Sequence, residues 1–153
     1  MSTPRARSRR AAHLLALGGA LVVVPAQAAW LLNRTELSPR TAVGEVLYAP
    51  ANTDERFTGI GLFCNGRQPT FYVYGADMPS PLAFQIEVDG RRETLRLARA
   101  GDAHWMAPVA RDFGPRLASA RTVRGSSDGG VRWNGIDMAG ARSVVTRALS
   151  ACG

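Results

Sequence analysis

The chain has 153 residues, and its 19 basic residues are all arginine, set against 12 acidic residues for a formal net charge of +7. Four of these arginines and none of the acids lie in residues 1–28, so residues 29–153 carry a formal charge of only +3. A charge this small does not indicate a nucleic-acid-binding protein. The absence of lysine is most simply explained by the coding bias of a GC-rich genome.

Residues 1–28 are predicted to be a cleavable export signal. A basic start is followed by an apolar run at residues 11–24 and by small residues at the minus-three and minus-one positions of a cleavage site after Ala28. A membrane anchor would need roughly 20 apolar residues, whereas this run is shorter and ends at Pro25. Export of the unfolded chain is favoured, and the pair Arg9-Arg10 leaves the twin-arginine route open as an alternative. We therefore expect no membrane span after cleavage.

Residues 29–153 have the length of one domain that can bury a core of its own. They contain the chain's two cysteines, Cys64 and Cys152. Their spacing excludes a CxxC redox pair, and His104, the lone histidine outside the signal, argues against a metal site. The sequence therefore predicts a structural disulfide and a periplasmic or secreted location.

The first half of this domain is predicted to be strands joined by tight turns. Short runs rich in β-favouring residues occur at residues 42–50 and 58–64, and Asn65-Gly66 follows as a strong hairpin signal. Residues 70–74 alternate two tyrosines with Phe and Val, so one of the two faces must belong to the core. The strand at 58–64 places Cys64 on its apolar face.

A second hairpin follows. Residues 84–88 alternate apolar with polar side chains, Asp89-Gly90 supplies a two-residue turn, and the alternation resumes at residues 95–97. Residues 104–109 predict a further strand that is closed by Pro108. These patterns are typical of antiparallel strands with one face in solvent.

The last part of the domain predicts two helices. Apolar residues at helical spacing occur in residues 113–123 behind Pro115, and a loop at 125–130 and a strand at 131–138 follow. Apolar residues in 141–152 recur at i, i+3, i+4, i+7, i+8 and i+11, the stripe of a half-buried helix. Cys152 lies on that stripe.

Together these elements predict an α+β domain that is mainly antiparallel β, with a sandwich-like or half-barrel sheet of about six or seven strands. A short helix and a C-terminal helix would pack on the sheet. Cys64 would then point inward from a strand and Cys152 inward from the last helix, so the bridge would tie that helix to the sheet.

The sequence predicts no catalytic residue, cofactor or metal site. Residues 125–129 match the GxSxG pattern, but a nucleophile elbow requires a strand-to-helix turn followed by an acid and a histidine, and His104 lies upstream. A glycine-serine loop is the favoured interpretation. His104 could act as a general base, but spacing identifies no nucleophile or orienting carboxylate for it, so an edge or core histidine is favoured.

Four aromatic residues of the predicted strands could form a binding face: Tyr72, Tyr74, Trp105 and Trp133. Aromatic residues on strands more often pack in a core or in cross-strand pairs. Packing is therefore the favoured interpretation, and the binding face stays an alternative.

Several short motifs resemble those of small exported proteins of the VasI or TagO type, which are envelope accessory proteins associated with type VI secretion in Gram-negative bacteria. The motifs are Trp30, Ser38-Pro39, Leu62-Phe63-Cys64, Val88-Asp89-Gly90, His104-Trp105, Ile136-Asp137-Met138-Ala139-Gly140 and Ala151-Cys152-Gly153. The resemblance implies a cysteine in a central strand paired with one at the end of the last helix. The chain also resembles invasion-associated envelope proteins with two cysteines.

We therefore expect a non-catalytic periplasmic accessory or binding protein with envelope or secretion-system proteins as partners, and no nucleic acid. The alternative is an inhibitor of a periplasmic or host hydrolase such as lysozyme, which would insert an exposed loop, residues 54–56 or 125–130, into an enzyme cleft. An enzyme that uses His104 is a third hypothesis.

Overall fold

The computed structural model describes residues 29–47, 56–127 and 133–153. Within these ranges the chain forms nine strands, two α-helices and one short 3₁₀-helix. The strands are β1 (Trp30–Asn33), β2 (Thr41–Leu47), β3 (Phe57–Asn65), β4 (Gln68–Gly75), β5 (Leu82–Val88), β6 (Arg91–Arg99), β7 (His104–Pro108), β8 (Val123–Ser126) and β9 (Asn134–Ile136). The helices are α1 (Phe113–Ser119), α2 (Ala141–Leu149) and η1 (Ser150–Cys152).

The predicted α+β class with a mainly antiparallel sheet is confirmed, but the sheet is larger than the expected six or seven strands. The unpredicted strands, β1 and β8, have four residues each, which is too short for a clear alternation. β8 replaces the end of the predicted first helix and the start of the predicted loop, because α1 already ends at Ser119.

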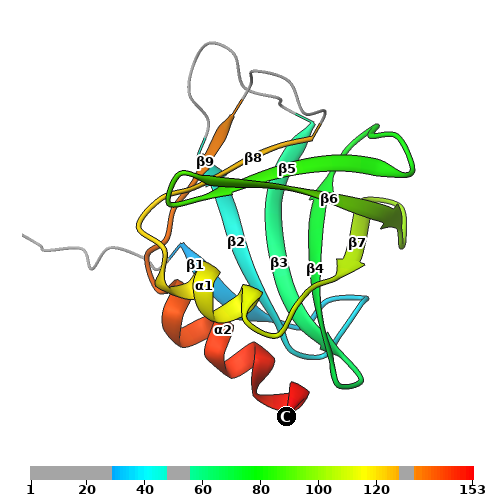
Figure 1. Cartoon of the computed structure of the whole chain (residues 1–153). Coiled ribbons are helices and arrows are strands. Elements are labelled where there is room, and N and C mark those ends of the chain that lie inside the picture. Colours follow the sequence, from blue (N-terminus) through cyan, green and yellow to red (C-terminus); the bar gives the residue numbers. More distant parts are fainter. Residues whose placement is uncertain (1–28, 48–55, 128–132) are drawn as a thin grey trace, which may run out of the picture.

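The sheet closes on itself. Its strand order is β1-β2-β3-β4-β7-β6-β5-β8-β9, all pairs are antiparallel, and β9 also pairs with β2 through Val46↔Ile136 and Leu47↔Gly135. The strands β2 to β9 therefore form a ring, and β1 lies outside it along the first half of β2 (Figure 1). Closure leaves an enclosed interior that side chains must fill.

The two predicted hairpins are present. Gly66 has a φ of 65° at the tip of the β3–β4 turn, and Asp89 and Gly90 have φ values of 46° and 83° between β5 and β6. Positive φ at both central residues is the geometry that Asp-Gly favours in a two-residue turn. Local turn chemistry therefore fixes the register of β5 on β6.

The hydrophobic core fills the interior of the ring. Phe84 is fully buried in it, with its ring centroid 5.2 Å from that of Phe57 and 5.8 Å from that of Phe71. The core also shows which face of β4 points inward. Phe71 and Val73 belong to the buried core cluster, whereas Tyr72 lies outside that cluster. The tyrosine face of β4 is therefore the outer face of the sheet.

The helices pack beside one end of the ring. Figure 1 shows α1 and α2 side by side, with α2 against β1, β2 and β3. The stripe predicted for α2 is buried at Ala141, Val145 and Ala148, and η1 continues it to the buried Cys152. No helix within the described ranges is long and apolar enough to span a membrane.

Cys64 and Cys152 form a disulfide bond, the pairing predicted from the sequence. Their Cα atoms lie 5.4 Å apart although the residues are 88 positions apart in the chain. Cys64 is near the end of β3, and Cys152 is the last residue of η1. The bond therefore ties the end of the C-terminal helical segment to the sheet.

The outer face of β3 and β4 depends on glycines beneath tyrosines. A Cβ atom built at Gly61 would overlap the ring of Tyr72, and one at Gly59 would overlap the ring of Tyr74. Tyr72 is only 1% exposed, so its ring has little room to move away. The ring of Tyr72 can therefore pack on β3 in this way because Gly61 has no side chain.

We expect Gly61→Ala to lower the free energy of unfolding by about 1 to 3 kcal/mol, the usual effect of overpacking. The measurement is urea denaturation in the wild-type and Tyr72→Leu backgrounds. Because Leu removes the ring that the new methyl would meet, Gly61→Ala should be much less costly beside Tyr72→Leu. An equal cost in both backgrounds would contradict this packing argument.

Asp89 connects the β5–β6 turn through hydrogen bonds to the segment between α1 and β8. Its Oδ1 accepts hydrogen bonds from the backbone N–H groups of Arg121 and Thr122, each at 3.0 Å. The Thr122 N–H, followed by the Arg121 N–H, holds the pKa of Asp89 below its usual value of 3.8. A lowered pKa in the folded state means that the carboxylate stabilises the fold above pH 3.8, and that this stabilisation is lost as the pH falls through the folded pKa.

We expect Asp89→Asn, which keeps an acceptor oxygen but cannot titrate, to weaken the acid dependence of unfolding. Urea denaturation from about pH 5 to about pH 2 measures the effect. The wild-type free energy of unfolding should fall more steeply below about pH 4 than that of the variant. Parallel curves for the two proteins would show that Asp89 is not one of the groups responsible.

Candidate functional site

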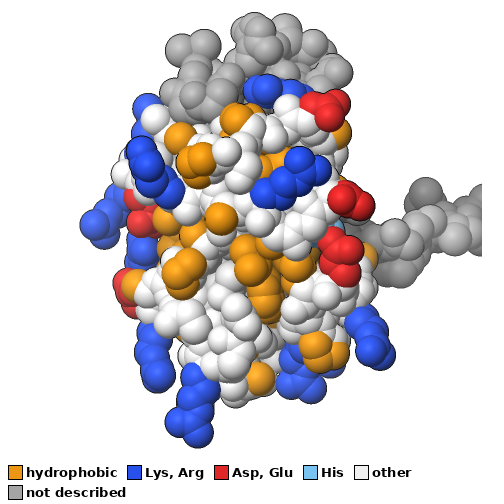
Figure 2. All heavy atoms as spheres, turned by 90° about the vertical axis from the view of Figure 1, so that its right-hand side faces the viewer, with side chains coloured by type: hydrophobic (Ala, Val, Ile, Leu, Met, Phe, Trp, Pro, Cys, Tyr) orange, Lys and Arg blue, Asp and Glu red, His pale blue; other side chains and the backbone are white. Residues whose placement is uncertain are grey.

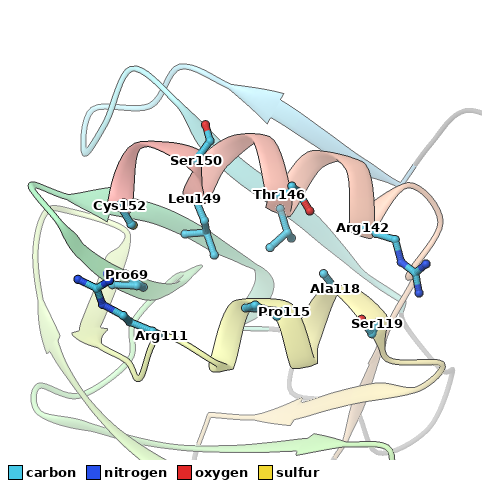
Figure 3. Close-up of a pocket in the computed structure, with 12 residues that line it drawn as sticks. Pro69, Arg111, Pro115, Ala118, Ser119, Arg142, Thr146, Leu149, Ser150 and Cys152 are labelled. Atoms are coloured by element: carbon cyan, nitrogen blue, oxygen red, sulfur yellow. The ribbon is translucent and has the colours of Figure 1, made fainter.

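A groove lies between α1 and α2 on the surface of the protein, with a volume of about 460 Å³ (Figure 3). We call it the α1–α2 groove. It is lined by Pro69, Arg111, Pro115, Ala118, Ser119, Arg142, Val145, Thr146, Leu149, Ser150, Cys152 and Gly153. Most of these side chains are apolar or small, so the groove offers a hydrophobic floor.

Small residues let the two helices approach each other below this groove. A Cβ atom at Gly114 would overlap Cδ1 of Leu149, so a larger residue at that position would force the end of the Leu149 side chain to move. Val145 is 1% and Ala118 9% exposed, so both belong to the packed layer beneath the groove. Cys152 is also part of the lining, and the disulfide therefore helps to hold this end of the groove in place.

The groove has an arginine at each end. Figure 3 shows Arg111 beside Pro69 and Cys152, and Arg142 at the opposite end near Ser119. Within the part of the chain that the structure describes, neither arginine forms an ion pair. Arg116 on α1 is different, because Asp112 at 3.2 Å and Glu93 at 3.3 Å compensate its charge.

The positive charge extends beyond the groove. A neighbouring hollow shares Ala118, Arg142 and Thr146 with it and adds Arg147. Neither set of lining residues contains an aspartate or a glutamate, and α2 itself has two arginines and no acid. This end of the molecule is therefore suited to an anionic ligand.

The structure does not place the four aromatic residues proposed for a binding face together. Tyr72 and Tyr74 pack with His104 on the outer face, at centroid distances of 5.4 Å and 6.4 Å. Trp105 follows His104 on β7 and therefore points to the opposite face, into the core. Trp133 lies elsewhere, under the guanidinium of Arg92 at 4.4 Å.

The outer aromatic cluster is built for packing. Phe63 lies 6.1 Å from Tyr72 and is 2% exposed, and a carboxylate oxygen of Glu36 lies 2.6 Å from Nδ1 of His104. Burial, with a smaller contribution from Tyr74, raises the pKa of Tyr72 well above its usual range. Tyr72 therefore keeps its proton at neutral pH and is unsuited to act as a base or nucleophile beside His104.

Another hollow lies on the outer face where β6 and β7 meet. It has a volume of about 300 Å³, and Ala98, Met106 and Pro108 are among its lining residues. Figure 2 shows apolar side chains gathered in the middle of this side of the molecule, with acidic side chains toward its margins. Polar groups from the β3–β4 turn, Asn65 and Gln68, also line the hollow, so it is less apolar than the α1–α2 groove.

The structure also bears on the GxSxG match and on the loops proposed for an inhibitor. Ser126 and Ser127, the serines of the GxSxG match, are 0% and 2% exposed, so neither is presented as a nucleophile on a surface turn. Ser126 ends β8 and does not lie in the loop predicted from residue 125. Ala28 at the predicted cleavage site, residues 54–55 of one loop proposed for an inhibitor and residues 128–130 of the other lie outside the described residues.

The described residues offer little for metal chemistry. Among them, no group of three or more His, Cys, Asp or Glu side chains could hold a metal ion. Both cysteines are used in the disulfide. The α1–α2 groove is therefore the feature on which an assignment of function can be based.

No family model, no curated protein and no solved structure matches this chain.

Proposed function

We propose that this chain is a non-catalytic accessory protein of the bacterial envelope, and that it binds a partner protein in the α1–α2 groove. The observation that carries the proposal is the combination of an apolar floor with an arginine at each end, Arg111 and Arg142, neither of which has an ion-pair partner among the described residues. An apolar floor provides affinity when it is covered, and the polar ends orient what binds there.

The chemistry of the lining favours binding over catalysis. Its titratable side chains are Arg111 and Arg142, and arginine stays protonated in proteins and cannot exchange protons near neutral pH. Ser119, Thr146 and Ser150 supply hydroxyl groups, but the lining contains no histidine or carboxylate side chain to activate them. The residues present can hold a ligand, and they lack the parts for nucleophilic or acid–base catalysis.

The proposed location is the periplasm. The signal-like features of residues 1–28 support it, as does the disulfide, because such bonds persist in oxidising compartments. We propose that the partner is an envelope or secretion-system protein. The resemblance to proteins of the VasI or TagO type makes type VI secretion the first system to examine.

Photo-crosslinking in the intact cell tests this proposal. The groove position is Thr146, which is exposed and lines the groove, and the control is Thr94, which is exposed on β6. Each is replaced by p-benzoylphenylalanine in the full chain, and crosslinked proteins are identified by mass spectrometry. We expect one envelope protein to be crosslinked from position 146 and not from position 94. The absence of any crosslink from position 146, or the same products from both positions, would refute the proposal.

A further inference from the structure

We infer that the groove recognises an extended acidic segment of the partner, with two carboxylates about four residues apart and an apolar side chain between them. This inference rests on the proposed function and adds the chemistry of the partner.

The spacing of the carboxylates follows from the length of α2. Arg142 is in the first turn of α2, whereas Nη1 of Arg111 lies 3.6 Å from the Cβ position of Gly153, beyond the other end of the helix. Residues 142 and 153 are eleven positions apart, so at a rise of 1.5 Å per residue the helical segment separates them by roughly 16 Å. Four residues of an extended chain cover about 13 Å of that distance and leave the two carboxylates on one face, and the long side chains of arginine and glutamate span the remainder.

The short length of α1 favours an extended segment over a helix. With seven residues α1 is only about 10 Å long, so a helix laid along the groove would have little of α1 to pack against. The floor of the groove is formed by Ala118, Val145 and Leu149. A central Leu or Val of the segment would lie on this floor.

The charge of the site favours a ligand with two carboxylates. A guanidinium group binds a carboxylate through two parallel hydrogen bonds, and no acidic side chain in the lining competes for Arg111 or Arg142. A fatty acid has one carboxylate and would leave one arginine unpaired. Membrane insertion would need protruding apolar side chains, and the large apolar residue that is exposed in the described structure, Leu31 at 51%, is on β1 and not in the groove.

A blocked fluorescent peptide with the sequence Glu-Val-Leu-Val-Glu serves as the probe, and binding is measured by anisotropy with the intact protein. We expect Arg111→Gln and Arg142→Gln each to weaken binding by about tenfold. Arg96→Gln, which alters an exposed arginine of β6 outside the groove, should leave binding unchanged. The peptide with glutamine in place of both glutamates should bind about a hundredfold more weakly, and added salt should weaken binding of the acidic peptide.

Several outcomes would overturn the inference. They are failure of the peptide to bind at millimolar concentration, equal binding to the Arg111→Gln/Arg142→Gln protein, and equal binding of the glutamine peptide. Tight binding of palmitate or of anionic phosphatidylglycerol vesicles that displaces the peptide would also overturn it. If the crosslink from Thr146 persists while the acidic peptide fails, the proposed function stands and the acidic partner is wrong.

Discussion

Replacement of both cysteines, Cys64→Ala with Cys152→Ala, is expected to lower the free energy of unfolding by about 4 to 5 kcal/mol. The disulfide closes a loop with a sequence separation of 88, so it removes many conformations from the unfolded chain. Domains of this size are typically stable by about 5 to 15 kcal/mol, so the loss would be a large fraction of the total. Urea denaturation of the oxidised wild type and the double variant measures it.

Reduction of the wild-type protein provides the matched control. The reduced protein should unfold at the same urea concentration as the double variant, because the same covalent bond is missing from both. Hydrogen exchange should become faster first in α2 and η1, whose end is held to β3 by the bond. A loss of stability below about 1 kcal/mol, or unchanged protection of α2, would show that packing alone holds the helix.

Much of the fold could be predicted because its signals are local. The turns at Gly66 and Gly90 need positive φ, and the sequence places glycine at both. The stripe that ends at Cys152 has the period of a helix, and α2 with η1 forms there. Given an inward cysteine on a strand and another on this helix, the disulfide followed from two local patterns.

Closure of the sheet could not be predicted in this way. It depends on pairing between β2 and β9, whose partners Val46 and Ile136 are far apart in sequence, and no local pattern encodes such a pairing. β1 and β8 are four-residue strands that exist because neighbouring strands hydrogen-bond to them. The formation of these two strands therefore depends on contacts with neighbouring strands more than on the β-propensity of their own residues.

The candidate site was missed for a related reason. In the sequence, Arg142 is a polar residue beside the apolar stripe of a helix, which is typical of a solvated face. Its significance depends on α1 packing against α2 at Gly114, which brings Arg111 to the other end of the same groove. The usable signal was weak: α2 contains two arginines and no acid, and Arg111 stands just before α1, outside any helix.

Trp30 is the residue through which β1 joins the rest of the protein. Its side chain is 1% exposed and packs over Gly44, where a Cβ atom would overlap the ring. Its Nε1 donates a hydrogen bond of 2.7 Å to the carbonyl oxygen of Asp137, and its backbone N–H donates to that of Ala139. One indole thus connects β1, β2 and the segment that leads into α2.

We expect Trp30→Ala to lower the free energy of unfolding by about 3 to 5 kcal/mol, because it opens a large cavity and leaves the Asp137 carbonyl oxygen without its indole donor. Trp30→Phe should cost less, since it keeps a buried aromatic ring and loses the donor together with the remainder of the indole. Leu31→Ala is the control, because the next side chain on β1 points outward and is 51% exposed, and its effect should stay within about 0.5 kcal/mol. Urea denaturation of the three variants measures these losses. Equal losses for Trp30→Ala and Leu31→Ala would mean that the indole does not stabilise the protein. A loss that is largest for Trp30→Ala, smaller for Trp30→Phe and smallest for Leu31→Ala would show that the indole holds β1 to the segment that leads into α2.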